Sequence, residues 1–271
     1  ASHGKSRSRR LRPPRAAAGR RRCSKLQVDE RNCLGCGACH WLCTMGAISF
    51  AASVRPDRKL RSEIDQEVCV DCGVCLRSGV CPADALIQPP AGWPRSLRGT
   101  FSNPLAEHKE TRVPGRGTEE MKTNDVTGRY RPGFVGVGIE MGRPNTGAYL
   151  SEVEKLTVPL AAAGVTFEPK NPLSALIGPD GKVNPEALGE KVLSCIIEFV
   201  IPRERLAEIL ACIDEAAPWL GTVCSIDLVE LVGPQTSGTL AWLRGLGQRP
   251  YPNGKINVGL GKLPPAEGGL G

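Results

Sequence analysis

Eight of the twelve cysteines in this chain fall into two sets of four with the spacing of iron–sulphur ligands. The first set reads C-x2-C-x2-C-x3-C and the second reads C-x2-C-x2-C-x5-C-P. Three cysteines at successive steps of three form a tight loop whose thiolates converge on one cubane cluster. The members are Cys33, Cys36, Cys39 and Cys43 in the first set, and Cys69, Cys72, Cys75 and Cys81 in the second.

The fourth cysteine of each set lies too far round its turn to join the other three. In the bacterial run of this type it ligates the other cluster. We therefore predict two [4Fe–4S] centres with crossed ligands, folded as one interlocked unit. The first is held by Cys33, Cys36, Cys39 and Cys81, and the second by Cys69, Cys72, Cys75 and Cys43.

Two other uses of cysteine fit the spacing less well. A disulfide scaffold is typical of a short secreted chain, and this chain of 271 residues shows no secretory segment. A zinc ribbon also uses paired C-x-x-C knuckles, but it needs only four ligands and leaves the third cysteine of each triplet without a role. Zinc remains the alternative to iron–sulphur clusters.

Composition places most of the basic charge in one tail. The net charge is +7, yet residues 1–22 hold nine Lys or Arg and no acid, which leaves 26 basic against 28 acidic residues in the rest. Because the tail lacks a hydrophobic pattern, we expect it to be disordered, and we expect no nucleic-acid partner for the body. No apolar run approaches the ~20 residues of a membrane span, so we expect a cytoplasmic protein.

The periodicity of the remaining chain predicts an α+β protein. After a ferredoxin-type domain at 23–90, residues 91–132 show little periodicity and read as a linker or a functional loop. Residues 133–235 alternate between strand and helix periods in the order βαββαβ, a ferredoxin-like (ACT-like) arrangement, and 236–271 form an extension. The strands are expected at 134–141, 165–168, 195–200 and 223–232, the main helices from 150 and from 202, and an accessory helix at 185–193.

Several features of this second domain invite a functional reading that its strand pattern does not favour. Gly136, Gly138 and Gly142 resemble part of a dinucleotide fingerprint, but they lie inside a strand, where close backbone packing is the simpler reading. Cys195 and Cys224 alternate with large apolar residues and are expected to face inward as small hydrophobes.

Residues 23–90 resemble the two-cluster bacterial-type ferredoxins beyond the cysteines themselves. Short strands at 26–29 and 63–65 precede the two motifs, and strands at 47–50 and 85–88 follow them, as two pseudo-symmetric halves. The resemblance implies a protein that carries electrons, with a redox partner such as a ferredoxin or a reductase subunit.

The chain as a whole resembles bacterial 6-hydroxynicotinate reductases. The matching segments are the cysteines from 33 to 81, then 108–112, 115–129, 140–144 and 253–259. The resemblance implies reduction of an N-heteroaromatic ring, and that family is also associated with flavin, for which no motif is assigned here. Lys122 and Arg129 are candidates to hold the carboxylate of such a ring, because charge-assisted hydrogen bonds are stronger than neutral ones.

Two classes of function follow from these patterns. In the first, the chain is an electron-transfer protein or a reductase component. In the second, it is a regulatory module in which a cluster senses redox state and an ACT-like domain binds a ligand and forms dimers. Two fully ligated cubanes favour the first class, since a sensor needs only one labile cluster.

Overall fold

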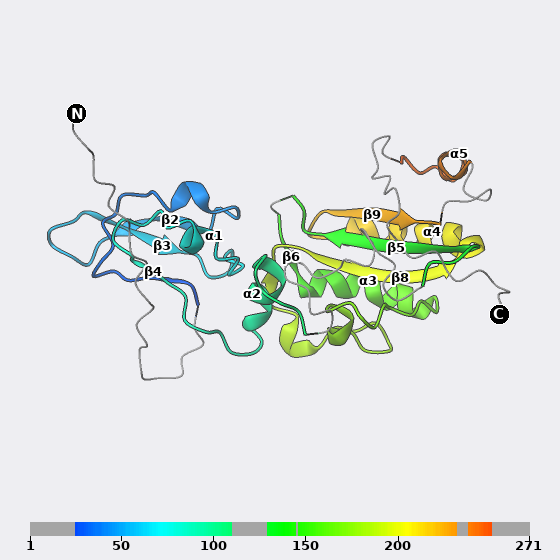
Figure 1. The fold of residues 1–271 in the computed structure, drawn as a ribbon, viewed down its shortest axis with the longest axis horizontal. Coiled ribbons are helices and arrows are strands. Elements are labelled where there is room, and N and C mark those ends of the chain that lie inside the picture. Colours follow the sequence, from blue (N-terminus) through cyan, green and yellow to red (C-terminus); the bar gives the residue numbers. More distant parts are fainter. Residues whose placement is uncertain (1–24, 110–128, 145, 232–237, 251–271) are drawn as a thin grey trace, which may run out of the picture.

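The computed structural model of the chain describes residues 25–109, 129–144, 146–231 and 238–250. It is a mixed helix and sheet protein, with a cysteine-rich unit at one end and a three-stranded sheet with its helices at the other (Figure 1). Within the described ranges, no helix is long and apolar enough to cross a membrane. The basic tail, Cys23, Lys122 and nearly all of segment 115–129 lie outside those ranges.

Two antiparallel strand pairs build the cysteine-rich unit. Strand β1 (Gln27–Val28) pairs with β4 (Leu86–Ile87), and β2 (Ile48–Ala52) pairs with β3 (Leu60–Ile64). In each pair a strand that precedes one cysteine set meets a strand that follows the other. This pairing interlocks the two halves, as the sequence predicted. A 3-10 turn (His40–Leu42) lies in the first set and helix α1 (Val74–Arg77) in the second.

The two cysteine sets bend the backbone at matching places. Positive φ angles occur two residues after the first cysteine, one residue after the second, and three residues after the fourth. The matched pairs, with their φ angles, are Gly35 (66°) and Asp71 (53°), Gly37 (71°) and Gly73 (70°), and Gly46 (65°) and Asp84 (48°). Glycine adopts this region freely and aspartate more readily than most residues. The pseudo-symmetry therefore extends to the backbone of each turn.

The second unit is a sheet of order β8-β5-β9 in which all neighbours are antiparallel. Its strands are β5 (Phe134–Met141), β8 (Cys195–Pro202) and β9 (Cys224–Val229). Helices α3 (Leu150–Ala162) and α4 (Leu206–Ala216) follow β5 and β8 in the chain and pack against each other. The predicted strand at 165–168 is reduced to a single antiparallel bridge between Phe167 and Phe199 at the free edge of β8.

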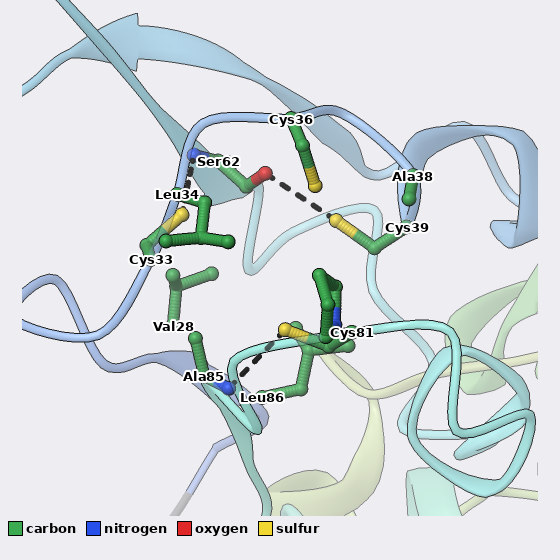
Figure 2. Close-up of a pocket in the computed structure, with 11 residues that line it drawn as sticks. Val28, Cys33, Leu34, Cys36, Ala38, Cys39, Ser62, Cys81, Ala85 and Leu86 are labelled. Atoms are coloured by element: carbon green, nitrogen blue, oxygen red, sulfur yellow. Dashed lines mark hydrogen bonds between the residues drawn. The ribbon is translucent and has the colours of Figure 1, made fainter. Parts of the chain in front are cut away.

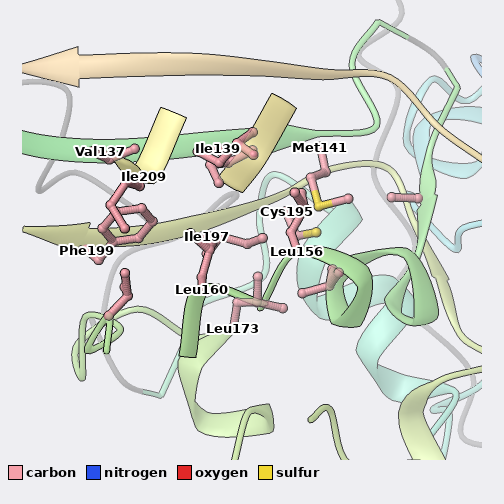
Figure 3. Packing of buried hydrophobic residues seen from close by; sticks show 14 of the residues in the cluster. Val137, Ile139, Met141, Leu156, Leu160, Leu173, Cys195, Ile197, Phe199 and Ile209 are labelled. Atoms are coloured by element: carbon pink, nitrogen blue, oxygen red, sulfur yellow. The ribbon is translucent and has the colours of Figure 1, made fainter. Parts of the chain in front are cut away.

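Alternate residues of the central strands form the core of this unit. Figure 3 shows Val137, Ile139 and Met141 of β5 beside Ile197 and Phe199 of β8, all at most 1% exposed. They meet apolar side chains of α3 and α4, as the period-2 and period-3.6 patterns predict. Gly136 of β5 serves close packing, because a Cβ on this residue would lie 2.4 Å from the Tyr130 ring.

The prediction of an accessory helix at 185–193 is wrong. Asn184 does accept a hydrogen bond from the Glu186 amide, but only a 3-10 turn (Pro185–Ala187) follows. Residues 191–192 then form β7 (Lys191–Val192), which pairs with β6 (Ala148–Tyr149). Strand pairing therefore overrides the local helical tendency.

Part of the expected linker is a helix. Helix α2 (Ser96–Ser102) lies between the cysteine-rich unit and the sheet, near β6 (Figure 1). It buries Leu97 and Phe101 in the core of the second unit. The remaining short elements are α5 (Thr239–Gly245) and 3-10 turns at Ser174–Leu176, Arg203–Arg205 and Ala217–Trp219.

Candidate metal centres

The first cavity of the cysteine-rich unit brings together three thiols of one set and one thiol of the other. Its cysteines are Cys33, Cys36, Cys39 and Cys81. Figure 2 shows these four around the cavity, with Val28, Leu34 and Leu86 completing an apolar wall. The grouping matches the four residues that the sequence assigned to the first centre.

The second cavity has the complementary set of thiols. Its cysteines are Cys43, Cys69, Cys72 and Cys75. Leu26, Met45, Ile48 and Val70 contribute apolar surface. The structure thus gathers all eight predicted ligands into two groups of four, each containing the fourth cysteine of the opposite set.

The interlocked strands explain why the fourth cysteines cross over. Cys81 lies four residues before Ala85, whose amide donates to the Cys81 sulphur over 3.2 Å. The same contact recurs in the other half, where the Ala47 amide donates to the Cys43 sulphur over 3.1 Å. Because β4 pairs with β1 and β2 with β3, each of these turns is held against the opposite cysteine loop.

Further hydrogen-bond donors face the sulphurs of the first centre. The Cys33 sulphur accepts from the Gly35 amide at 3.5 Å and from the Ser62 amide at 3.4 Å. The Ser62 hydroxyl lies 3.3 Å from the Cys39 sulphur and 3.2 Å from Nε2 of His40. Such donors stabilise thiolate charge, and hydrogen bonds to sulphur are one of the factors that set a cluster's reduction potential.

Burial makes two of the free thiols of the second centre weak acids. It raises the pKa of Cys69 to about 12 and that of Cys75 to about 11. Because metal ligation requires the thiolate, assembly of a cluster there must displace protons that the free thiols hold at neutral pH. In the first centre, Cys33 and Cys39 are also buried, and Cys36 is the one exposed cysteine of the eight.

The donor sets suit iron–sulphur clusters. Each cavity presents four thiols and an apolar wall, which is the ligand set of a [4Fe–4S] cluster. Among the described residues, no three His, Cys, Asp or Glu side chains gather closely enough to hold a single metal ion. Instead, four thiols line the wall of each cavity.

Comparison with known families agrees with this chemistry. The family model described as a 4Fe-4S dicluster domain matches residues 32–85. This segment is a ferredoxin-type iron–sulphur domain, and its general function is electron transfer. No curated protein matches the chain. The resemblance of the whole chain to 6-hydroxynicotinate reductases stays a prediction.

One of the two predicted ring-binding cations is described, and it lies in an internal ion pair. The Arg129 guanidinium contacts the carboxylate of Glu168, whose side chain is 3% exposed. In the segment 140–144, the Arg143 guanidinium lies 3.1 Å from the Glu140 carboxylate and donates to the Ser194 hydroxyl over 3.3 Å. The structure does not bring either arginine to the cysteine cavities.

Sequence reasoning missed three charged residues beside the second centre. Asp71, Arg95 and Arg98 are buried, and the two arginines reach the cysteine loop from the segment expected to be a linker. One feature of the sequence could have indicated these residues. Asp71 occupies the position that Gly35 holds in the first set, so it is a charge where the symmetry calls for glycine.

A glycine substitution provides a test of the first cysteine loop. A Cβ on Gly35 would lie 2.2 Å from the backbone oxygen of Leu60, whereas a Cβ on Gly46 has no atom within 4 Å. Both glycines have positive φ, so alanine at either position shares a strain of roughly 1–2 kcal/mol. We expect Gly35→Ala alone to lose about half of the bound iron, measured per chain after anaerobic purification. Equal amounts of bound iron in Gly35→Ala and Gly46→Ala would show that the close approach to the Leu60 backbone oxygen does not matter.

Cys195 is expected to resist alkylation in the folded protein. Its side chain is 1% exposed, and burial raises its pKa to about 12, so almost no thiolate exists at neutral pH. The thiolate is the nucleophile, and the partly exposed Cys212 provides a comparison in the same unit. Mass spectrometry after treatment with iodoacetamide should find Cys212 modified first and Cys195 only after unfolding. Labelling of both at one rate would show that Cys195 is accessible.

Proposed function

We propose that this chain holds two [4Fe–4S] clusters with crossed ligands and relays single electrons through them. The first is held by Cys33, Cys36, Cys39 and Cys81, and the second by Cys69, Cys72, Cys75 and Cys43. The observation that carries the proposal is the division of the eight thiols between two cavities in these two groups. A [4Fe–4S] cluster, when bound, accepts and releases one electron at a time.

The exposure of the cysteines supports a direction of electron transfer through the cysteine-rich unit. Each centre has two buried cysteines in its triplet, but Cys36 of the first is exposed, whereas Cys72, its counterpart in the second, is only partly exposed. Met45, which lines the second cavity, also reaches the second unit, because its Cε lies 3.0 Å from where a Cβ on Gly147 would be. We propose that a partner protein exchanges electrons at the Cys36 side and that the second centre faces the acceptor side.

The acceptor in this proposal is an N-heteroaromatic acid of the 6-hydroxynicotinate type. Its support is the resemblance to 6-hydroxynicotinate reductases, two of whose matching residues, Glu140 and Arg143, lie at the end of β5 that leads toward Gly147. The second unit, at 133–235, binds the acceptor or docks the subunit that does. Arg129 is engaged with Glu168, so ring recognition is proposed for the unit and not for that residue.

Anaerobic reoxidation tests the proposal. The purified protein is reduced with dithionite, freed of excess reductant, and mixed with 6-hydroxynicotinate, while absorbance reports the clusters and chromatography reports the ring. Nicotinate, which lacks the 6-hydroxyl group, serves as the matched control compound, and an oxidised bacterial ferredoxin serves as a protein acceptor.

Three outcomes are distinguishable. Reoxidation with loss of the aromatic ring supports a reductase. Reoxidation by the ferredoxin alone supports an electron-transfer component and excludes the ring as the direct acceptor. If 6-hydroxynicotinate binds but neither it nor the ferredoxin reoxidises the clusters, the electron relay is contradicted and a sensor is favoured.

A further inference from the structure

Two arginines at helix α2 reach into the loop that carries Cys69. Arg95 forms an ion pair with Asp71, with 2.7 Å between Nε and Oδ2 and 3.2 Å between Nη2 and Oδ1. The side chains of Arg95 and Asp71 are only 8% and 2% exposed. The pair is therefore bidentate and sealed from solvent, the geometry in which guanidinium and carboxylate interact most strongly.

The same arginines hold the backbone of the cysteine loop. Arg95 Nη1 donates to the Gln66 carbonyl over 2.9 Å, and Arg98 Nη1 donates to the Gln66 carbonyl over 2.8 Å and the Cys69 carbonyl over 2.9 Å. Arg98 also pairs with Glu190 of the second unit. Helix α2 thus connects the loop of the second centre to the sheet-containing unit.

The Asp71 carboxylate lies beside a ligand sulphur. Its Oδ1 is 3.6 Å from the Cys69 sulphur and accepts from the Leu26 amide at 3.4 Å. A buried charge at this distance acts strongly on a neighbouring group, because little solvent screens it. The Arg95 guanidinium neutralises that charge from the other side of the carboxylate.

Among the described residues, no ion pair beside the first centre has both partners buried. The position that matches Asp71 is Gly35, which carries no charge. Arg58 donates to the Cys33 carbonyl, but its side chain is 23% exposed and its partner Asp57 is 53% exposed. Arg61 pairs with Glu30 and Glu63, which are 39% and 53% exposed. Solvent screens these pairs, so the two centres differ in their fixed charges although their backbones match.

We propose that the Asp71–Arg95 pair sets the reduction potential of the second cluster, with both residues acting as positioning residues through the Cys69 loop. The proposal rests on the two-cluster function proposed above. Reduction transfers one electron from an external donor to the cluster and adds one negative charge there. Asp71 alone opposes that charge and Arg95 alone favours it, so the intact pair holds the potential between these limits.

Neutralising each partner separately therefore has opposite expected effects. Asp71→Asn keeps the shape and tolerates the left-handed backbone at this position, and it leaves Arg95 uncompensated. We expect the ratio of reduced to oxidised second cluster at fixed solution potential to rise about tenfold, which is 59 mV for a one-electron couple. Arg95→Gln should lower that ratio about tenfold, and the double variant should return to within about threefold of the original protein.

The measurement is an anaerobic redox titration followed by electron paramagnetic resonance, with iron counted per chain in every sample. Arg58→Gln is the matched control, and we expect it to leave the second cluster unchanged because the exposed pair is screened. If the Arg95→Gln variant loses its second cluster, the Arg95→Lys variant is measured in its place. That variant keeps the charge and should stay within about threefold of the original ratio.

The outcomes separate this inference from the function on which it rests. Opposite shifts confined to the second cluster support it. Shifts of the same sign, or none, in variants that retain eight irons would overturn it and leave the relay intact. A protein that binds only one cluster before any substitution would instead contradict the proposed function.

Discussion

Replacing Cys81 with alanine is expected to destroy the cluster held by Cys33, Cys36 and Cys39, although Cys81 follows the other three cysteines of the second set. The reason is geometric, because the Cys81 sulphur lines the first cavity and not the second. Loss of one of four thiolate ligands should convert the first cluster to an incomplete form or release it. Cys43→Ala should have the reciprocal effect on the second cluster.

Two further variants provide reference spectra for this prediction. Cys36→Ala removes a thiol that both assignments place at the first centre, and Cys72→Ala removes one that both place at the second. In the reduced proteins, the surviving electron paramagnetic resonance signal of Cys81→Ala should coincide with that of Cys36→Ala, and the signal of Cys43→Ala with that of Cys72→Ala. If Cys81→Ala resembled Cys72→Ala instead, ligation within each set would be correct and the interlocked assignment wrong.

Arg98→Met is expected to destabilise the folded protein by about 3–5 kcal/mol, the usual effect of removing one partner of a buried ion pair. The Arg98 side chain is 4% exposed, and its loss leaves the Glu190 carboxylate without its cation and removes the shorter donor to the Cys69 carbonyl, while the Gln66 carbonyl keeps Arg95. Anaerobic urea unfolding of the cluster-loaded protein measures the change. For a protein of this size, thermal unfolding should move down by about 10 °C.

Two further variants separate charge burial from lost packing. Replacing both partners, as Arg98→Met with Glu190→Met, should recover part of the loss, because no buried charge is then left unpaired. Lys182→Met breaks an exposed pair with Asp180 and should change little. Stability of Arg98→Met equal to that of Lys182→Met would show that α2 does not fasten the two units together.

The ligand grouping could be predicted from sequence because spacing alone limits which thiols share a cluster. Cys33, Cys36 and Cys39 lie on one short loop, and Cys43 is too far round it. The two longest strands were also accessible, since the alternation of large apolar residues in 134–141 and 195–200 indicates strands. The strand at 165–168 was overestimated. The chain turns away at once there, with the Asn171 amide bonded to the Glu168 carbonyl over 3.0 Å.

Helix α2 and its arginines could not be predicted in the same way. The helix spans seven residues, contains Gly99, and is surrounded by prolines, so it has no clear period. Arg95 and Arg98 read as solvent-exposed residues of a linker. Their burial depends on Asp71 and on Glu190, which lies 92 residues after Arg98. Long-range charge pairing of this kind leaves no local pattern in a sequence.

The most direct test of the two-cluster relay is the iron and sulphide content of anaerobically purified protein, combined with electron paramagnetic resonance of the reduced form. We expect eight iron and eight sulphide per chain, four of each from each cluster, and a spectrum broadened by interaction between two neighbouring reduced centres. Four iron per chain with a single isolated signal, or zinc in place of iron, would contradict the two-cluster relay.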